Sequence, residues 1–250
     1  MGDSFDMKDM EDFLDASSES RLRVESDLGD GFVRLRVTEA QKRQAKQDIR
    51  SAEDVAIELL RNAGARTIFF ATSLSKNRRT MVLVDDGAGI PERMWDAVFE
   101  PRVTSKLDAL RFDDWGVHGR GMALYSISQN VSSARVMRSA PSQGTAVRVD
   151  IDPSTLSERS DQSTLPCLVK AADGHWTLSS SPHSIVRIAA EFALGCRRDT
   201  TVYFGSIVSI AATMRAYGKA LMRREDECER PFASMDAPVR LLSAARNADE

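Results

Sequence analysis

The pattern of apolar and polar positions divides the first 150 residues into strands and helices of ordinary length. Apolar and charged residues alternate over 32–37 and again over 145–151, which predicts two half-buried strands. Runs of β-branched and aromatic residues over 64–73 and 80–85 predict two more strands. The intervening elements are predicted as one helix, or two with a break near Ser51, over 38–62, a loop over 86–111, a Gly-rich turn over 115–121 and a helix over 122–131.

Two capping patterns mark the starts of the helical segments before residue 62. Thr38 is followed three residues later by Gln41, and Ser51 by Asp54, the spacing of capping boxes. Apolar residues then recur at helical spacing and are expected to pack on the sheet. They are Ala56, Leu59, Leu60 and Ala63. The order of helices and strands therefore indicates an α/β (α+β) sandwich.

The second half of the chain begins with a stretch rich in Ser, Pro and Asp over 152–166, which is typical of a linker. Beyond it the pattern predicts strands over 175–180 and 200–205, and helices over 184–194, 206–221 and 236–246. We therefore predict two domains. The boundaries are an acidic N-terminal lead-in over 1–31, a first α/β domain over 32–152, a linker over 153–168 and a second, smaller α/β domain over 169–250.

Composition and charge narrow the classes of protein that the chain can represent. It has 250 residues, of which 42% are hydrophobic and 28% charged, as in soluble globular proteins. No apolar run approaches the ~20 residues that span a bilayer, and the acidic start is unlike a signal peptide, so a cytoplasmic location with no membrane partner is expected. The net charge of -3 gives no support to a nucleic-acid partner, although it leaves one open. The three cysteines, Cys167, Cys196 and Cys228, lack the spacing of a zinc cluster.

The stretch MVLVDDGAGI, residues 81–90, carries the first candidate chemistry. Asp85 ends a predicted strand, and Gly87 and Gly89 after it allow a ligand to approach the backbone. A buried carboxylate needs a donor, and the exocyclic amine of adenine is one. A second Gly-rich turn, with Gly119 and Gly121, stands before a helix whose free N–H groups favour phosphate.

Glu58 and Asn62 form the third candidate element. They are four residues apart and share one face of the predicted helix. An amide oxygen suits Mg²⁺, and a carboxylate nearby suits a water or hydroxyl that is to be activated. Each pattern alone is common, so the interpretation depends on all three occurring in this order.

Together these motifs resemble those of the GHKL ATPase superfamily of gyrase, MutL and the histidine kinases, built on the Bergerat fold. The resemblance covers 32–152 and implies a Bergerat-type two-layer α/β sandwich that binds ATP and Mg²⁺. It implies that Glu58 is the catalytic base, that Asn62 holds the metal, that Asp85 receives the adenine amine, and that Lys106 begins a lid over the phosphates. The cofactor-binding residues that it implies are Asn62, Asp85, Gly87, Gly89, Lys106, Gly119, Arg120, Gly121 and Thr145. Asp86 is expected only to border the metal site.

Three functions remain open at this stage. The leading hypothesis is a Mg²⁺-dependent ATPase whose lid closure controls a protein partner or a second copy of the chain. The second is a kinase that phosphorylates a His or Ser of a partner, although no histidine precedes residue 62, where a sensor kinase would carry its phosphoacceptor. The third is a nucleotide sensor without turnover, suggested because the segment between Asn62 and the next strand is shorter than in the family.

Residues 174–246 resemble the HPr phosphocarrier of the sugar phosphotransferase system. The shared features are His183 just before a helix, a β-rich TTVYFG and an amphipathic helix after it. The resemblance implies a second, HPr-like α/β sandwich domain with His183 as a possible phosphoacceptor. The alternative is that His183 is a polar residue at a helix start and that this module binds a partner.

Overall fold

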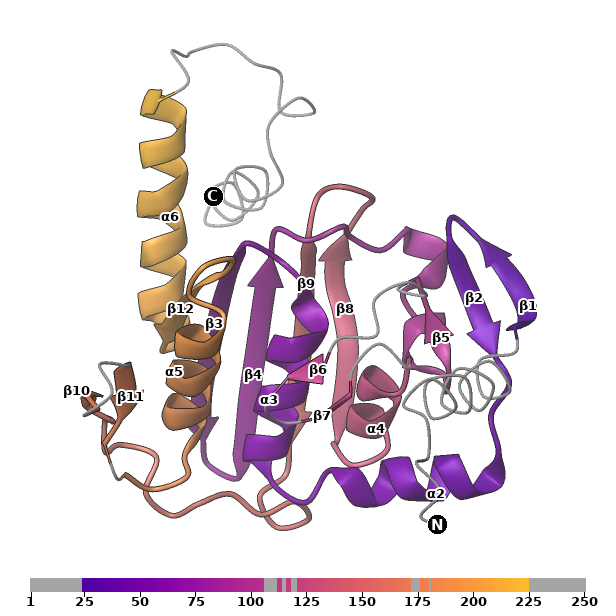
Figure 1. Cartoon of the computed structure of the whole chain (residues 1–250), viewed down its shortest axis with the longest axis horizontal. Coiled ribbons are helices and arrows are strands. Elements are labelled where there is room, and N and C mark those ends of the chain that lie inside the picture. Colours follow the sequence, from indigo (N-terminus) through magenta and orange to yellow (C-terminus); the bar gives the residue numbers. More distant parts are fainter. Residues whose placement is uncertain are drawn as a thin grey trace, which may run out of the picture.

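A mixed five-stranded sheet forms the centre of the computed structural model, which describes residues 24–105, 112–113, 116–117, 121–171, 176–179 and 181–224 (Figure 1). The strand order is β12–β3–β4–β9–β8, with β12 parallel to β3 and the other neighbours antiparallel. The strands are β12 (Thr201–Gly205), β3 (Thr67–Ser75), β4 (Arg78–Asp85), β9 (Thr145–Ile151) and β8 (Ser133–Ser139). The sheet and its helices confirm the mixed α/β sandwich predicted from the sequence.

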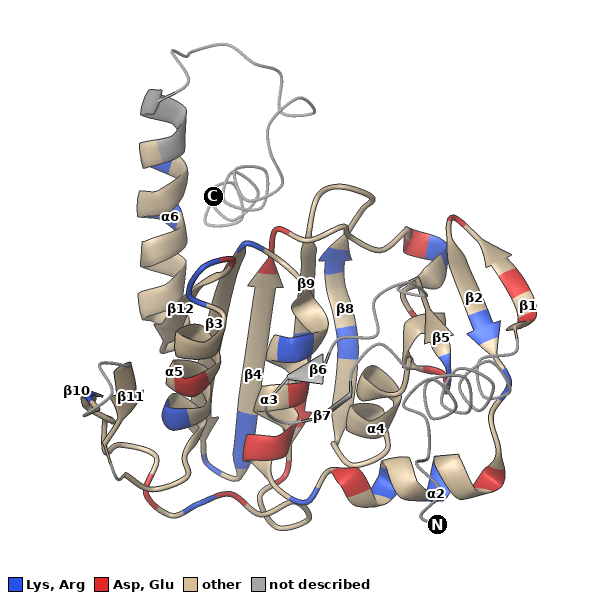
Figure 2. Ribbon diagram, viewed as in Figure 1, with Lys and Arg blue, Asp and Glu red and all other residues tan. Residues whose placement is uncertain are grey.

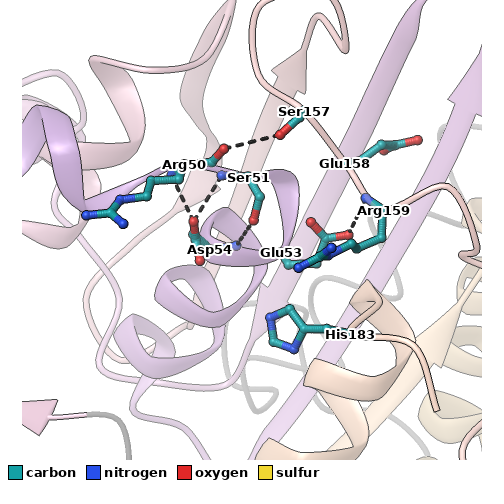
Figure 3. A pocket seen from close by; sticks show the side chains of 8 residues that line it. All are labelled: Arg50, Ser51, Glu53, Asp54, Ser157, Glu158, Arg159 and His183. Carbon is teal, nitrogen blue, oxygen red and sulfur yellow. Dashed lines mark hydrogen bonds between the residues drawn. The ribbon is translucent and has the colours of Figure 1, made fainter.

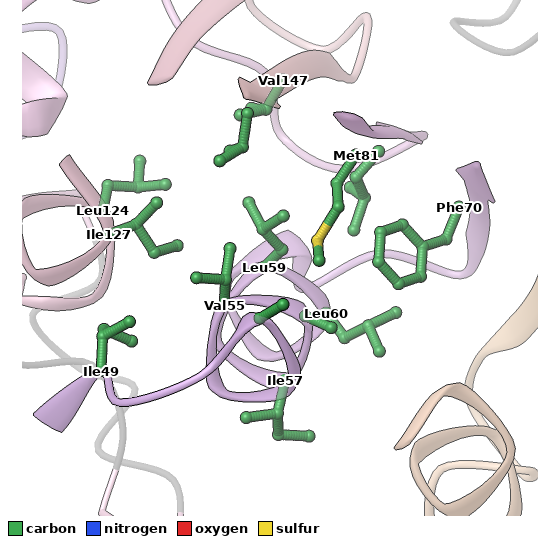
Figure 4. Close-up of a cluster of buried hydrophobic side chains, with 14 of the residues drawn as sticks. Ile49, Val55, Ile57, Leu59, Leu60, Phe70, Met81, Leu124, Ile127 and Val147 are labelled. Carbon is green, nitrogen blue, oxygen red and sulfur yellow. The ribbon is translucent and has the colours of Figure 1, made fainter. Parts of the chain in front are cut away.

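Helices cover the two faces of this sheet unequally. One face packs on α3 (Ala52–Ala63), α4 (Ala123–Ser128) and α5 (Ile185–Gly195), and their apolar side chains form the main core (Figure 4). On the other face, Phe69 of β3 stacks on Tyr203 of β12 at 5.0 Å between ring centroids. α6 (Ile207–Arg224) packs over this pair through Ile210 and Tyr217. α6 therefore adds a helix to the face that a two-layer sandwich would leave open.

The helix α3 lies at the centre of the main core (Figure 4). Val55 and Leu60 are inaccessible to solvent, and burying a side chain of this kind stabilises a fold by about 1.5–3 kcal/mol. Ser51 caps the helix in a capping box with Asp54, and Gly64 ends it in the left-handed conformation. The preceding helix, α2 (Glu39–Asp48), ends before Ser51, so of the two alternatives left by the sequence the structure has two helices with a break near Ser51.

The N-terminal part of the described chain forms a small antiparallel sheet of β1 (Val24–Gly29), β2 (Phe32–Leu35) and β5 (Val103–Thr104). A tight turn joins β1 to β2 at Asp30 and Gly31, both with positive φ. Arg93 forms an ion pair with Asp30 at 2.6 Å. β1 lies within the stretch predicted as a lead-in, because its sequence VESDLG has too few apolar residues to mark a strand.

The remaining described elements are short. They are η1 (Glu92–Met94), η2 (Ala97–Phe99), β6 (Phe112–Asp113), β7 (Gly116–Val117), β10 (Leu168–Lys170) and β11 (Trp176–Leu178). The first two stand in the loop predicted after β4, and the last two pair as a hairpin beside α5. The helix predicted over 236–246 lies outside the described residues.

The C-terminal elements join the first sheet, and here the structure differs from the expected pair of separate domains. β12 pairs with β3 along its whole length, and α5 packs on α3. Thr200 Oγ1 also donates to Ala65 O at 2.8 Å. The physical reason is the edge of β3: this buried apolar strand would leave a row of unpaired backbone groups if β12 were absent. α5 and β12 therefore pack into the main core and α6 packs on the other face of the same sheet, so no separate HPr-like sandwich is formed among the described residues.

The stretch predicted as a linker is fixed against the start of α3. The N–H of Ala52 donates to Ser157 O at 2.9 Å, and Leu156 is buried in the main core. Figure 2 shows Asp and Glu as well as Lys and Arg on both α2 and α3. Within the described part of the chain, no helix has both the length and the apolar character needed to cross a membrane.

Candidate functional site

Asp85 stands at the end of β4, at the edge of the sheet where the first glycine motif begins. Its side chain is buried, with 5% of the residue exposed. Its Oδ1 accepts the N–H of Gly87 at 2.8 Å, so the carboxylate folds the chain into a tight turn after the strand. The predicted carboxylate at the end of a buried strand is therefore present.

Asp86 has a different set of contacts from its neighbour. Its Oδ1 accepts the backbone N–H groups of Arg66 and Thr67, each at 2.8 Å. Its own N–H donates to Thr67 O at 3.2 Å. These three bonds tie the end of β4 to the start of β3, so Asp86 stabilises this end of the strand pair.

The change of Asp86 to alanine is expected to lower the free energy of unfolding by about 2 kcal/mol, because hydrogen bonds to a charged group contribute about 1.5–3 kcal/mol. Asp86→Asn keeps one acceptor oxygen and serves as the matched control, with a loss of about 1 kcal/mol or less. Urea unfolding followed by circular dichroism measures both. Equal stability of Asp86→Ala and the parent protein would contradict this role.

Three glycines fix the loop after Asp85 against its neighbours. A Cβ atom added at Gly87 would lie 2.9 Å from Ala63 O, at the C-terminal end of α3. One added at Gly89 would lie 1.8 Å from Ala140 O, and one at Gly144 would lie 1.9 Å from Asp85 O. The loop is thus held between the end of α3 and the turn before β9, with no room for side chains at these positions.

Thr145 lies opposite Asp85 in the register of β9 against β4. It is 6% exposed, and its Oγ1 is 3.0 Å from Ser139 Oγ. Ser139 Oγ donates its single proton to Gly144 O at 2.8 Å and accepts the N–H of Ile90 at 2.7 Å. Thr145 must therefore be the donor to Ser139, which fixes the orientation of its hydroxyl. Sequence reasoning missed Ser139 because the charged residues of β8 (SARVMRS) obscure the strand.

Glu58 and Asn62 lie on α3 at half-buried positions, as the helical spacing predicts. Glu58 Oε1 forms an ion pair with Arg61 Nη1 at 3.0 Å. Asn62 stands in the last turn of the helix, next to Ala63, whose carbonyl oxygen faces Gly87. The structure therefore brings the end of α3 that carries Asn62 to the loop after Asp85, and an amide oxygen at that place is a ligand type that Mg²⁺ accepts.

The second glycine motif is described only in part. Gly121 has a φ of 65°, and its carbonyl oxygen accepts the N–H of Arg102 at 2.9 Å. A Cβ atom at Gly121 would lie 2.8 Å from Val103 O, so this glycine packs on β5. α4 follows it and packs on α3. Lys106, Gly119 and Arg120 lie outside the described residues.

His183 is placed apart from the residues around Asp85. It precedes Ser184, the N-cap of α5, and lines a cavity with Ser51 and Glu53 at the N-terminal end of α3 (Figure 3). Asn62 stands near the opposite end of the same helix, about 16 Å from Ser51 along the helix axis at a rise of ~1.5 Å per residue. Among the described residues, no group of three or more His, Cys, Asp or Glu side chains is arranged to hold a metal ion.

Comparisons with known proteins give similarity to solved structures only. No family model matches the chain, and no curated protein matches it. A structure titled "Mycobacterial sensor histidine kinase MprB" aligns at 20% identity with a TM-score of 0.28, covering 45% of this chain and 87% of that one. Full-length ShkA in complex with AMPPNP aligns at 15% identity with a TM-score of 0.31, covering 77% of this chain and 43% of that one. Because both TM-scores are below 0.5, the function of this chain has to be inferred from its own site.

Proposed function

We propose that this chain binds ATP together with Mg²⁺ at the end of the sheet where β4 stops, and that it hydrolyses the nucleotide. The observation that carries the proposal is the meeting of three segments distant in sequence: the end of α3, the loop after Asp85 and the start of β9. Gly87 against Ala63 O and Gly144 against Asp85 O hold these segments in contact. The buried carboxylate of Asp85 supplies an acceptor for a purine amine at their junction.

The proposed roles follow the chemistry of each side chain. Asp85 accepts the exocyclic amine of adenine, and Thr145, opposite it in the sheet, lies beside the same ring. Asn62 supplies an oxygen ligand to Mg²⁺, which would neutralise charge on the phosphates. Glu58, one turn earlier on α3, takes the proton of the attacking water. Lys106, Gly119, Arg120 and Gly121 are proposed as phosphate contacts by the order of the motifs.

A second candidate function, a nucleotide sensor without turnover, is favoured by one observation. Arg61, of which 8% of the side chain is exposed, forms the ion pair with Glu58. A general base has to contact the attacking water, and a carboxylate oxygen held by a guanidinium is less available for that contact. If this pair persists when nucleotide is bound, Glu58 does not reach the water and the chain binds ATP without hydrolysing it.

Calorimetric titration with ATP and Mg²⁺, followed by a phosphate-release assay, tests both candidates. We expect Glu58→Ala to lower kcat about 100-fold or more, since a positioned general base contributes about 10²–10⁴-fold. The Kd for ATP should stay within about threefold of that of the parent protein, because Glu58 acts on the water. Glu92→Ala, at an exposed carboxylate on η1, is the matched control.

Three outcomes of this test have different consequences for the two candidates. Binding without phosphate release in the parent protein supports the sensor. Hydrolysis by Glu58→Ala at the parental rate rejects the assignment of the base. Absence of ATP binding by the full chain rejects both candidates.

A further inference from the structure

A cavity of about 570 Å³ opens at the N-terminal end of α3, away from the residues around Asp85 (Figure 3). Three segments form its walls: the start of α3 with Ser51, Glu53 and Asp54, the residues Glu158 and Arg159, and His183 before α5. Cavities of about 300–1,000 Å³ are the usual size of small-molecule sites. The sequence motifs around Asp85 do not account for this cavity.

Glu53 provides the reason to assign a ligand to this cavity. The residue is 1% exposed, although it carries a carboxylate. Its Oε1 accepts the N–H of Arg159 at 3.1 Å and the side-chain amide of Gln162 at 2.5 Å. Its Oε2 is buried, and among the described residues no group donates to it. A buried carboxylate oxygen without a donor is costly, so a donor from outside the chain would complete this site.

The other carboxylates of the cavity are already bound by the protein. Asp54 Oδ2 accepts the N–H groups of Arg50 and Ser51 at 2.8 and 2.9 Å. Glu158 receives two hydrogen bonds from Arg79, at 2.7 and 2.9 Å. These pairings leave the Oε2 of Glu53 as the buried side-chain acceptor among the residues lining the cavity that lacks a partner within the described part of the chain.

Two arginines and a histidine stand at the rim of the same cavity. Arg50, Arg159 and His183 line it and are exposed (Figure 3). Arg50 uses its Nε to donate to Gln47 O of α2 at 3.1 Å, and Figure 3 shows its side chain extending away from Glu53, so Arg159 is the arginine nearer to that carboxylate. An acceptor in the wall and cations at the rim are complementary to a molecule with a donor at one end and an anion at the other.

We propose that this cavity binds a small zwitterion of the amino-acid class, with its ammonium group on Glu53 and its carboxylate on Arg159. An ammonium group carries three N–H donors and suits a single buried carboxylate. A metal ion suits the cavity less well, because no cluster of three ligating side chains occurs in the described residues. This site is separate from the proposed nucleotide site and does not depend on it.

Isothermal titration of the full chain with glycine, L-leucine, L-glutamate and L-lysine tests the proposal. Putrescine, which has amines without a carboxylate, and succinate, which has carboxylates without an amine, are the comparison probes. We expect at least one amino acid to bind with a Kd of about 1 mM or lower, and both comparison probes to bind at least about tenfold more weakly. Binding should be unchanged by saturating ATP.

Variants at Glu53 and Arg159 test the contacts of the ammonium group and of the carboxylate separately. Glu53→Gln should weaken amino-acid binding about tenfold or more, whereas the exposed Glu92→Gln should leave it unchanged. Arg159→Ala, at an exposed position, should weaken the binding of the amino acids and leave the binding of putrescine unchanged. This variant tests the proposal even if Glu53→Gln fails to fold. The proposal is overturned if no amino acid binds at about 10 mM, or if Glu53→Gln folds and binds as the parent does. Putrescine binding as tightly as the amino acids would also overturn it.

Discussion

Replacement of Gly144 by alanine is expected to lower the free energy of unfolding by about 4 kcal/mol or more, or to prevent folding. The added Cβ would lie 1.9 Å from Asp85 O and 2.9 Å from Asp85 C, both backbone atoms of β4. Backbone in a paired strand cannot move aside as a flexible side chain can, so β4 and β9 would have to separate where they meet. The φ of 74° adds strain of its own for a residue with a Cβ.

Gly31→Ala is the control that separates the two causes. Gly31 has nearly the same φ, 76°, but a Cβ there meets nothing within 4 Å. Its replacement should therefore cost only the backbone strain, about 1–2 kcal/mol. Urea unfolding of both variants measures the difference. Equal losses in the two variants would mean that the contact between Gly144 and Asp85 does not constrain the end of the sheet.

The sequence predicted the elements whose apolar pattern is strong. β3, β4 and β9 contain runs such as TIFFA and MVLV, and α3 has both an apolar stripe and a capping box. β8 and β1 were missed because polar residues interrupt their patterns and their positions depend on pairing with neighbours. The place of β12 was misjudged for a related reason: periodicity identifies a strand but carries no information on which edge it joins.

In the candidate site, too, some residues could be predicted from local sequence patterns and others could not. Asp85 at a strand end and Asn62 on a helical face follow from local patterns. The ion pair of Arg61 with Glu58 was open to prediction from its i, i+3 spacing, whereas the bond of Ser139 to Gly144 required the missing strand β8. The cavity beside Glu53 could not be predicted from the sequence, because its walls include segments that are more than 100 residues apart in the chain.

The change of Asp85 to asparagine is expected to weaken ATP binding about 10- to 100-fold while leaving the fold nearly as stable. The side-chain oxygen of asparagine can still accept the N–H of Gly87, so the turn is kept. Its NH₂ group then faces the exocyclic amine of adenine, donor against donor. Loss of a hydrogen bond to a charged group costs about 1.5–3 kcal/mol, which corresponds to one to two decades in Kd.

Nucleotide preference makes this prediction sharper than affinity alone. Guanine has a carbonyl oxygen where adenine has its amine, so the new NH₂ group at position 85 can donate to it. The ratio of ATP to GTP affinity should therefore fall in Asp85→Asn, while the exposed Asp96→Asn leaves both affinities unchanged. Calorimetric titration with each nucleotide measures the ratio, and thermal unfolding confirms that the variant is folded. If both the ratio and the Kd for ATP are unchanged, the purine lies away from Asp85, since a contact between the purine and residue 85 would change at least one of these two quantities.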